Sequence, residues 1–178
     1  MDFVVARLIA GRWFDVLTVV DRFTHECPLL LPDSSLTGHK IALALPEVIA
    51  ERGTPTSITV DNGTPFGSRA MNAWAYRYGV QLDFIRPGRP VENSYIESFN
   101  GRLRDDRLNV EVFFTLGDVR DKLERWRQDY NQVRQHSALA DHPETFAAQW
   151  AETAAPGPEP VPAQAGKPAM GTSLEPLT

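Results

Sequence analysis

Residues 57–65 read SITVDNGTP, a short β-branched run that ends in an acidic residue and a polar turn. The run from Ser57 to Val60 has the composition of a β-strand, and Asp61 closes it. Apolar residues at helical spacing lie on both sides of this strand, at about 36–52 before it and 68–78 after it. A strand between two helices indicates a sheet that is covered by helices.

Three apolar runs precede this region. The runs 3–9 and 13–20 are separated by Ala10-Gly11-Arg12 and predict a β-hairpin, and 27–31 predicts a third strand. Downstream, apolar residues alternate over 80–84 and predict a fifth strand. The expected class is therefore α/β, with a five-stranded mixed sheet flanked by helices.

The helical patterns carry recognisable start and stop signals. Gly53 and Pro55 suit the end of the first helix, although Pro46 inside it should kink the helix or cost about 3 kcal/mol. A third helix is expected over about 91–108, and a fourth opens at Thr115. Trp126 and Tyr130 lie on the apolar stripe of the fourth helix and are expected in the core rather than as base-stacking platforms.

Composition places the chain among ordinary globular proteins. Its 178 residues are 42% hydrophobic and 23% charged, and the formal net charge is −5. Taken alone, a negative charge argues mildly against nucleic-acid binding. No apolar run is long enough for a membrane span and the start does not read as a signal peptide, so no membrane association and a cytoplasmic location are expected.

The end of the chain differs from the rest. Residues 151–178 hold six of the 14 prolines, no aromatic residue and no apolar periodicity. Such a segment cannot bury enough surface to offset the entropy of ordering it. The expected organisation is a domain over 1–150 and a Pro/Ala-rich disordered tail over 151–178.

Three carboxylates stand out by their positions. Asp2 lies at the first predicted strand and Asp61 at the end of the fourth, and ligand sites of open α/β sheets form at strand ends. Glu97 shares a predicted helix face with Asn93, Gly101 and Arg104. Two alternatives stay open, since Asp61 could close an Asx turn and Glu97 could lie on a solvated helix face. If the three converge, they suit a two-metal site for phosphoryl transfer.

Five separated stretches resemble a known family in the correct order. They are MDFV (1–4), GRWFDVLTVVDRFTHE (11–26), RGTPTSITVDNGTPF (52–66), GVQLDFIRPGRPVENSYIESFNGRLRDDRLN (79–109) and RWRQDYNQVRQHSAL (125–139). Thirty-five residues lie between Asp61 and Glu97. The chain resembles the integrase catalytic core of bacterial insertion-sequence transposases, within the DDE transposase and retroviral integrase superfamily. The resemblance covers about 1–150 and implies a ribonuclease H-like fold.

The resemblance also implies a function. Asp2, Asp61 and Glu97 correspond to the DDE triad, which holds two Mg²⁺ or Mn²⁺ ions. The implied activity is that of a polynucleotidyl transferase, which nicks DNA and transfers strands during transposition. The implied partners are transposon ends, target DNA and further copies of the chain in a homodimer or higher oligomer.

Candidate DNA contacts surround the predicted Glu97 helix. We expect Arg104 on the triad face, contacting phosphate, with Arg86 and Arg89 as further candidates. Asn62 and Asn93 would orient carboxylates or contact DNA. Asp21, by contrast, follows the second strand rather than the first, so the family pattern favours Asp2 as the catalytic residue. His136 is expected to pack or cap, and Cys27 to be a buried apolar residue.

The family pattern includes an upstream helical DNA-end-binding region and residues that complete the first strand. This sequence, which opens Met1-Asp2, shows neither. An alternative function is therefore a truncated, non-catalytic fragment that binds DNA or full-length transposase. A ribonuclease H-type hydrolase is a third possibility on the same fold, and the family motifs argue against it.

Overall fold

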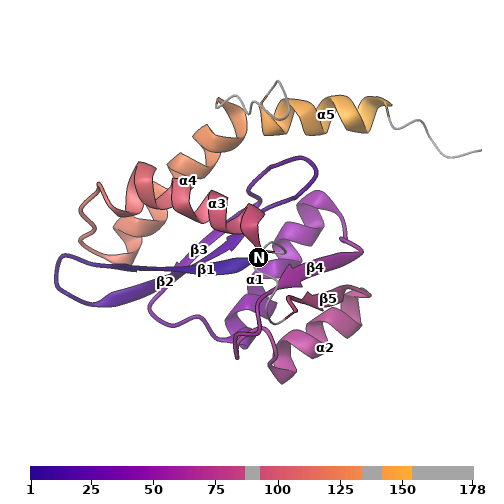
Figure 1. Cartoon of the computed structure of the whole chain (residues 1–178), viewed down its shortest axis with the longest axis horizontal. Helices are drawn as coiled ribbons and strands as arrows, with labels where there is room; N and C mark the ends of the chain where they lie inside the picture. The colour runs from indigo at the N-terminus through magenta and orange to yellow at the C-terminus, as the bar shows by residue number, and fades with distance from the viewer. Residues whose placement is uncertain (87–92, 134–141, 154–178) are drawn as a thin grey trace, which may run out of the picture.

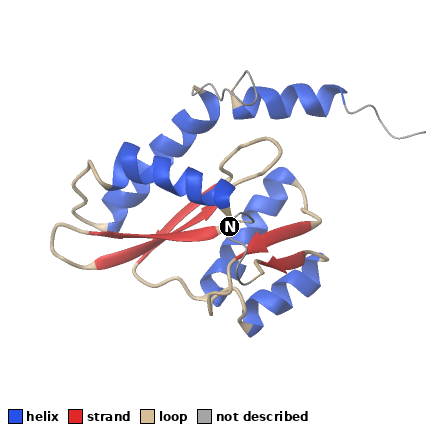
Figure 2. Ribbon diagram, in the orientation of Figure 1, coloured by secondary structure: helices blue, strands red, loops and turns tan. Residues whose placement is uncertain are grey.

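A computed structural model describes residues 1–86, 93–133 and 142–153. Three strands come first, then strands and helices alternate, and helices close the chain (Figures 1 and 2). In order, the elements are β1 (Asp2–Arg7), β2 (Trp13–Val19), β3 (Leu29–Asp33), α1 (Gly38–Arg52), β4 (Ser57–Val60), α2 (Arg69–Tyr78), β5 (Gln81–Phe84), α3 (Ser94–Leu103), the π-helix η2 (Arg104–Leu108), α4 (Leu116–Gln132) and α5 (Pro143–Thr153). The α/β class predicted from the sequence is confirmed.

Strands β1, β2 and β3 form an antiparallel sheet in that order. Asp2 lies opposite Thr18 and Arg7 opposite Trp13, so β1 and β2 are a hairpin, as predicted. The turn is closed where the Leu8 amide donates to the Arg12 carbonyl at 2.8 Å. Gly11 has φ +84°, a conformation that a residue with a Cβ rarely adopts.

Strands β4 and β5 form a separate parallel pair, with Ser57 opposite Gln81. The expectation of one five-stranded sheet is therefore corrected: the five strands divide into three and two. The amino terminus lies where the two sheets meet (Figure 1). There the Met1 ammonium donates to the Thr59 carbonyl at 2.7 Å. This one hydrogen bond does not form a strand ladder between β1 and β4. The two sheets therefore remain separate.

The helix ends carry local caps, and Thr115 is one that the sequence predicted. Thr37 accepts a hydrogen bond from the Lys40 amide at the start of α1, and Thr115 accepts one from the Asp118 amide at the start of α4. Gly79 ends α2 in the left-handed conformation, with φ +66°. Helix α1 continues through Pro46 to Arg52 as one element, so this proline does not end the helix.

Two helical regions differ from expectation. Residues 104–108, expected to be α-helical, form the π-helix η2, in which the Asn109 amide donates to the Arg104 carbonyl at 2.9 Å. Residues 91 and 92 of the expected third helix lie outside the described residues.

Helix α5 was not predicted, and it continues to Thr153, past the expected domain end at 150. The rings of Phe146 and Trp150 on α5 pack against Phe23, a contact that no local pattern indicates. The remainder of the expected tail, 154–178, is outside the described residues.

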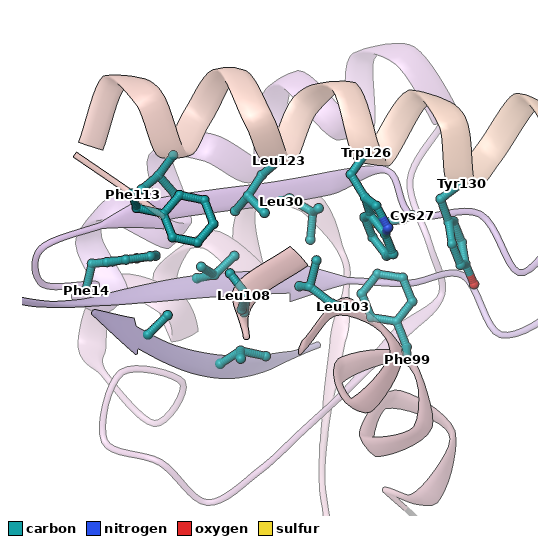
Figure 3. Close-up of a cluster of buried hydrophobic side chains, with 14 of the residues drawn as sticks. Phe14, Cys27, Leu30, Phe99, Leu103, Leu108, Phe113, Leu123, Trp126 and Tyr130 are labelled. Atoms are coloured by element: carbon teal, nitrogen blue, oxygen red, sulfur yellow. The ribbon is translucent and has the colours of Figure 1, made fainter. Parts of the chain in front are cut away.

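Apolar side chains form two clusters. One lies between the antiparallel sheet and helices α3 and α4, where Phe14, Phe99, Leu123, Trp126 and Tyr130 are buried (Figure 3). The other lies around β4 and is covered by α1 and α2, with Ile41, Leu45, Val60, Met71 and Trp74. The predicted core positions of Trp126 and Tyr130 are confirmed. Within the described residues, no helix is both long and apolar enough to cross a membrane.

Cys27 is fully buried, as predicted, and burial raises the pKa of its thiol above the ordinary value. The thiolate is the reactive form of cysteine, so both access and ionisation are suppressed. We expect a thiol-specific reagent such as dithionitrobenzoate to label the folded chain at least about 100-fold more slowly than the chain in denaturant. Since Cys27 is the one cysteine in the sequence, absorbance of the released thiolate follows this site alone. Equal rates in buffer and denaturant would contradict the burial.

Candidate active site

Asp2 is the first residue of β1 and is partly buried. Its Oδ1 accepts from the Phe3 amide at 2.8 Å, and its Oδ2 accepts from Asn100 Nδ2 at 2.9 Å. The pKa of the Asp2 carboxyl is raised, chiefly by burial and further by the negative charges of Asp61 and Glu97. The hydrogen bond from the Phe3 amide and the Met1 ammonium oppose this shift. Asp61 and Glu97 therefore both lie within electrostatic reach of Asp2.

Asp61 directly follows β4, and its Oδ1 accepts from the Gly63 amide at 2.9 Å. This is the Asx turn that the sequence left open as an alternative. The turn is tight, because a Cβ added at Gly63 would lie 2.8 Å from Asp61 Oδ1. A side chain at position 63 would therefore displace the Asp61 carboxylate from this turn, which holds Asp61 at the end of the strand.

Glu97 lies in the first turn of α3 and its side chain is exposed. Its amide donates to the Asn93 carbonyl at 3.1 Å, which closes that first turn. The opposite side of α3, with Ile96, Phe99 and Leu103, is buried, as the sequence predicts. This packing fixes the side of the helix from which Glu97 extends.

The carboxylates of Asp2, Asp61 and Glu97 are not grouped closely enough to share one metal ion. Among the described residues, no group of three or more His, Cys, Asp or Glu side chains is arranged to hold a metal ion. Two physical reasons account for this. Like charges repel without a cation between them, and both Asp2 and Asp61 accept local hydrogen bonds. The donor chemistry fits a hard divalent cation, for which carboxylate oxygen is the preferred ligand.

The Met1 ammonium is a cation beside this site. Burial lowers its pKa to about 6, and the negative charges of Asp2 and Asp61 oppose that shift. The group donates to the Thr59 carbonyl on β4 rather than to either carboxylate. It thus contributes positive charge next to the two aspartates over the pH range in which it is protonated.

Asn100 is a site residue that the sequence interpretation missed. It is 7% exposed, donates to Asp2 Oδ2, and its own Oδ1 is buried without a hydrogen-bond partner among the described residues. The available signal was its spacing, since residues three apart lie on the same helix face and Asn100 follows Glu97 by three. Its contact with Asp2 on β1 depends on tertiary packing and could not be predicted.

The structure places four of the five predicted DNA-contacting residues. Asn62 Nδ2 donates to the Ile85 carbonyl at 2.8 Å, which ties the turn after β4 to the end of β5. Asn93 caps α3 without a side-chain cap bond. Arg104 Nη1 donates to the Val5 carbonyl on β1 at 3.2 Å. Arg86 is exposed, and Arg89 lies outside the described residues, as does His136.

Asp21 has a local role. Its Oδ1 accepts from the Phe23 amide at 2.7 Å and from the Thr24 amide at 2.9 Å. These bonds close the turn after β2.

Comparison with known proteins gives the family. Two family models, each described as integrase core domain, match residues 1–90 and 78–143. An uncharacterized 31.7 kDa protein of insertion element IS407 from Burkholderia multivorans is 45% identical over 155 residues, which are 86% of this chain and 56% of that protein. An uncharacterized 39.2 kDa protein of insertion element IS476 from Xanthomonas euvesicatoria is 41% identical over 151 residues, 84% of this chain and 44% of that protein. The chain spans about half the length of these curated relatives.

Solved structures support the fold. A chain of the simian T-cell lymphotropic virus intasome in complex with PP2A regulatory subunit B56 gamma superposes with a TM-score of 0.66 at 17% identity, covering 97% of this chain and 58% of that one. The HTLV-2 integrase catalytic core domain in complex with magnesium superposes with a TM-score of 0.61 at 15% identity, covering 82% and 93%. The fold is therefore ribonuclease H-like. The family models, together with the relatives from insertion elements, establish that the chain belongs to the integrase core domain family.

Proposed function

We propose that this chain carries out metal-dependent nicking and strand transfer of DNA in transposition, with Asp2, Asp61 and Glu97 as the catalytic carboxylates. One observation carries the proposal. Asp2 on β1 lies close enough to Asp61 at the end of β4 and to Glu97 in the first turn of α3 that both negative charges help burial to raise its pKa. Such a cluster of like charges is unfavourable unless a cation or substrate uses it.

The proposed metal is Mg²⁺ or Mn²⁺, as two ions held by these carboxylates. Bound ions of this kind activate an attacking oxygen and stabilise a leaving oxygen at a phosphodiester. The magnesium named with the HTLV-2 integrase core supports a divalent cation for this chain as well. The relatives from insertion elements support DNA as the substrate, with transposon ends and target DNA as the two partners.

The chain's own residues position the carboxylates and the DNA. The Asn100 amide orients Asp2 by its bond to Oδ2, and the Asx turn orients Asp61. Arg104 uses one N–H donor on the Val5 carbonyl, and the guanidinium carries five donors, so we assign it a phosphate contact. Asn62, Asn93, Arg86 and Arg89 are the further proposed DNA contacts.

The proposed DNA substrate also bears on the oligomeric state of the chain and on its location in the cell. The HTLV-2 integrase core was solved in dimeric and trimeric forms. We propose a homodimer or higher oligomer for this chain, by analogy with those forms. Several copies together could hold the transposon ends and the target DNA at the same time. We propose a cytoplasmic location, because the relatives come from bacteria and the proposed substrate is DNA.

A second candidate is a non-catalytic fragment that binds DNA or full-length transposase. The observation that favours it is the open arrangement of the three carboxylates, which are not grouped to hold one metal ion. The two candidates differ in whether DNA is cut. A ribonuclease H-type hydrolase would instead cut the RNA strand of a hybrid.

The test uses a branched DNA duplex that mimics a strand-transfer product, because reversal of the joining step does not require recognition of an unknown transposon end. The purified chain is incubated with this DNA and Mn²⁺, and the products are resolved on a denaturing gel. Metal-dependent resolution of the branch supports the catalytic proposal. DNA binding without cleavage supports the fragment, and cleavage confined to an RNA–DNA hybrid supports the hydrolase.

Asn100 offers a test of positioning. In the variant Asn100→Ala, Asp2 loses its amide donor, and we expect the Mn²⁺ affinity to fall about 10- to 100-fold, as for other groups that orient metal ligands. The measurement is calorimetric titration of Mn²⁺ with DNA present, alongside the melting temperature. Asn72→Ala, at an exposed position on α2, is the matched control. An unchanged Mn²⁺ affinity in a folded Asn100→Ala chain would contradict the positioning role.

A further inference from the structure

The loop between β2 and β3, residues 20–28, is anchored to two helices by buried polar contacts. Glu26 is 4% exposed and forms an ion pair with Arg52 at the end of α1. The Cys27 amide donates to Asn131 Oδ1 on α4 at 2.9 Å, and the Cys27 carbonyl accepts from Asn131 Nδ2 at 3.1 Å. Buried polar networks with satisfied partners make a structure rigid. These contacts therefore hold the loop in one position relative to α1 and α4.

The tip of this loop, residues 22–25, lies beside the start of α3 (Figure 1). The His25 ring lies 5.1 Å from the ring of Tyr95. His25 also has φ +62°, a left-handed conformation that residues other than glycine rarely adopt. Backbone strain of this kind concentrates at functional sites. The contact brings the loop to a helix position two residues before Glu97.

Helix α3 carries two polar sides, separated by its buried side. Residues seven apart lie on the same side of a helix, so Tyr95 and Arg102 share one side, and Glu97 and Arg104 share the other. The buried residues between these two sides are Ile96, Phe99, Asn100 and Leu103. Arg102 is exposed and Tyr95 is partly buried. The side with Tyr95 and Arg102 is the one that the loop contacts.

Arg22 at the loop tip completes a cluster with Tyr95 and Arg102. Arg22 is exposed, and it lines the same cavity as Tyr95. Burial and then the negative charge of Asp21 raise the pKa of Tyr95 to about 12, while the positive charges of Arg102 and Arg22 oppose this shift. The Tyr95 hydroxyl therefore stays protonated at neutral pH and can donate a hydrogen bond. Neither arginine side chain has a hydrogen bond or an ion pair to another residue that the structure describes.

This chemistry suits the phosphodiester backbone of a nucleic acid. An arginine guanidinium binds phosphate oxygens through paired N–H donors, and a phenol adds a neutral donor. Asp21 brings one negative charge against the two positive charges of Arg22 and Arg102, so the cluster is positive overall. The cluster also adjoins the catalytic carboxylates, because the Met1 amino group lies within electrostatic reach of Arg22 as well as of Asp2 and Asp61.

We propose that Arg22, Tyr95 and Arg102 form a second phosphate-contact site, which binds the DNA backbone on the side of α3 opposite to Arg104. Phosphate contacts then flank α3 on both of its polar sides. Such contacts position a protein on DNA without reading the bases. The inference takes DNA as the ligand from the proposed function, but it does not depend on metal binding or on cleavage.

The experiment measures DNA binding by fluorescence anisotropy, with the full chain and two labelled duplexes of unrelated sequence. EDTA is present, so that no metal ion bridges the carboxylates and the DNA. The test variant combines Arg22→Gln and Arg102→Gln. We expect it to bind both duplexes about tenfold more weakly, with a slope of log affinity against log salt that is shallower by about 2, one for each lost phosphate contact.

Two further variants make the test specific. Arg12→Gln combined with Arg120→Gln removes the same charge at exposed positions in the hairpin turn and on α4. We expect its affinity to stay within about twofold of the wild type, because salt screens charges that do not contact the DNA. Tyr95→Phe keeps the ring beside His25 and removes the hydroxyl, so we expect about threefold weaker binding with an unchanged salt slope. Melting temperatures show that each variant is folded.

The inference is overturned if the variant that lacks Arg22 and Arg102 binds DNA as the Arg12 and Arg120 variant does. It is also overturned if the two duplexes respond unequally, if Tyr95→Phe binds as tightly as the wild type, or if the wild-type chain does not bind DNA. Failure of the catalytic proposal is a different result: DNA is bound with the expected salt dependence and is not cut when Mn²⁺ is supplied.

Discussion

Replacing Asp61 with asparagine is expected to lower metal-dependent DNA cleavage by about 10³-fold, the scale on which enzymes lose rate when a group that stabilises the transition state is removed. The substitution keeps the size of the side chain and an oxygen that can accept from the Gly63 amide, so the turn after β4 is preserved. What it removes is one of the negative charges that hold a cation. The measurement is the rate of branched-DNA resolution in Mn²⁺.

The control for this prediction is Asp105→Asn, which removes a charge at an exposed position just after α3. We expect this variant to retain the wild-type rate within about twofold, because a surface charge contributes little. Both variants should melt near the wild-type temperature. If Asp61→Asn cleaves DNA at close to the wild-type rate, the catalytic site is elsewhere on the molecule.

The second large effect concerns stability. Truncation of Trp126 to alanine is expected to lower the free energy of unfolding by about 3–5 kcal/mol, the usual range for a buried tryptophan. Trp126 is 1% exposed and lies at the centre of an aromatic cluster on α4 (Figure 3). Its ring lies 5.1 Å from that of Tyr130 and 5.6 Å from that of Phe99, and its Nε1 donates to Asp106 Oδ2 at 3.1 Å. Alanine would leave a cavity and remove the hydrogen bond to Asp106 Oδ2.

Urea denaturation followed by circular dichroism measures this loss. Trp13→Ala is the matched control, because Trp13 is 64% exposed on the edge of the hairpin. We expect that variant to lose about 1 kcal/mol or less, since surface substitutions away from special contacts have small effects. A loss of under about 1 kcal/mol for Trp126→Ala would mean that α4 does not hold the antiparallel sheet in the way described.

Local sequence chemistry predicted much of the secondary structure. The β-branched run in 57–60 and the glycine at 53 mark element ends that the structure repeats closely. Thr115 with Asp118 marks the start of α4 for the same reason, because a cap is made by residues three apart. Helix α5 and the π-helix η2 depend on contacts with distant residues, such as Phe23 with Trp150 and Trp126 with Asp106. Those contacts leave no local pattern.

The residues of the candidate site also differ in whether the local sequence could predict them. Asp61 was predictable because it ends an apolar strand and begins a polar turn, and Glu97 because it lies opposite the apolar side of α3. Their grouping with Asp2 rested on the family resemblance, since no spacing within one strand or helix reports a distance between elements. The role of Asn100 could be recognised only when β1 and α3 were placed together.

The most direct test of the metal site is calorimetric titration of Mn²⁺ into the chain with duplex DNA present. The account predicts that the wild-type chain binds Mn²⁺ and that Asp2→Asn, Asp61→Asn and Glu97→Gln each abolish or severely weaken that binding. Binding that is the same in all three variants would contradict the account. A wild-type chain that takes up no Mn²⁺ would contradict it as well, and would leave the non-catalytic fragment as the function of this chain.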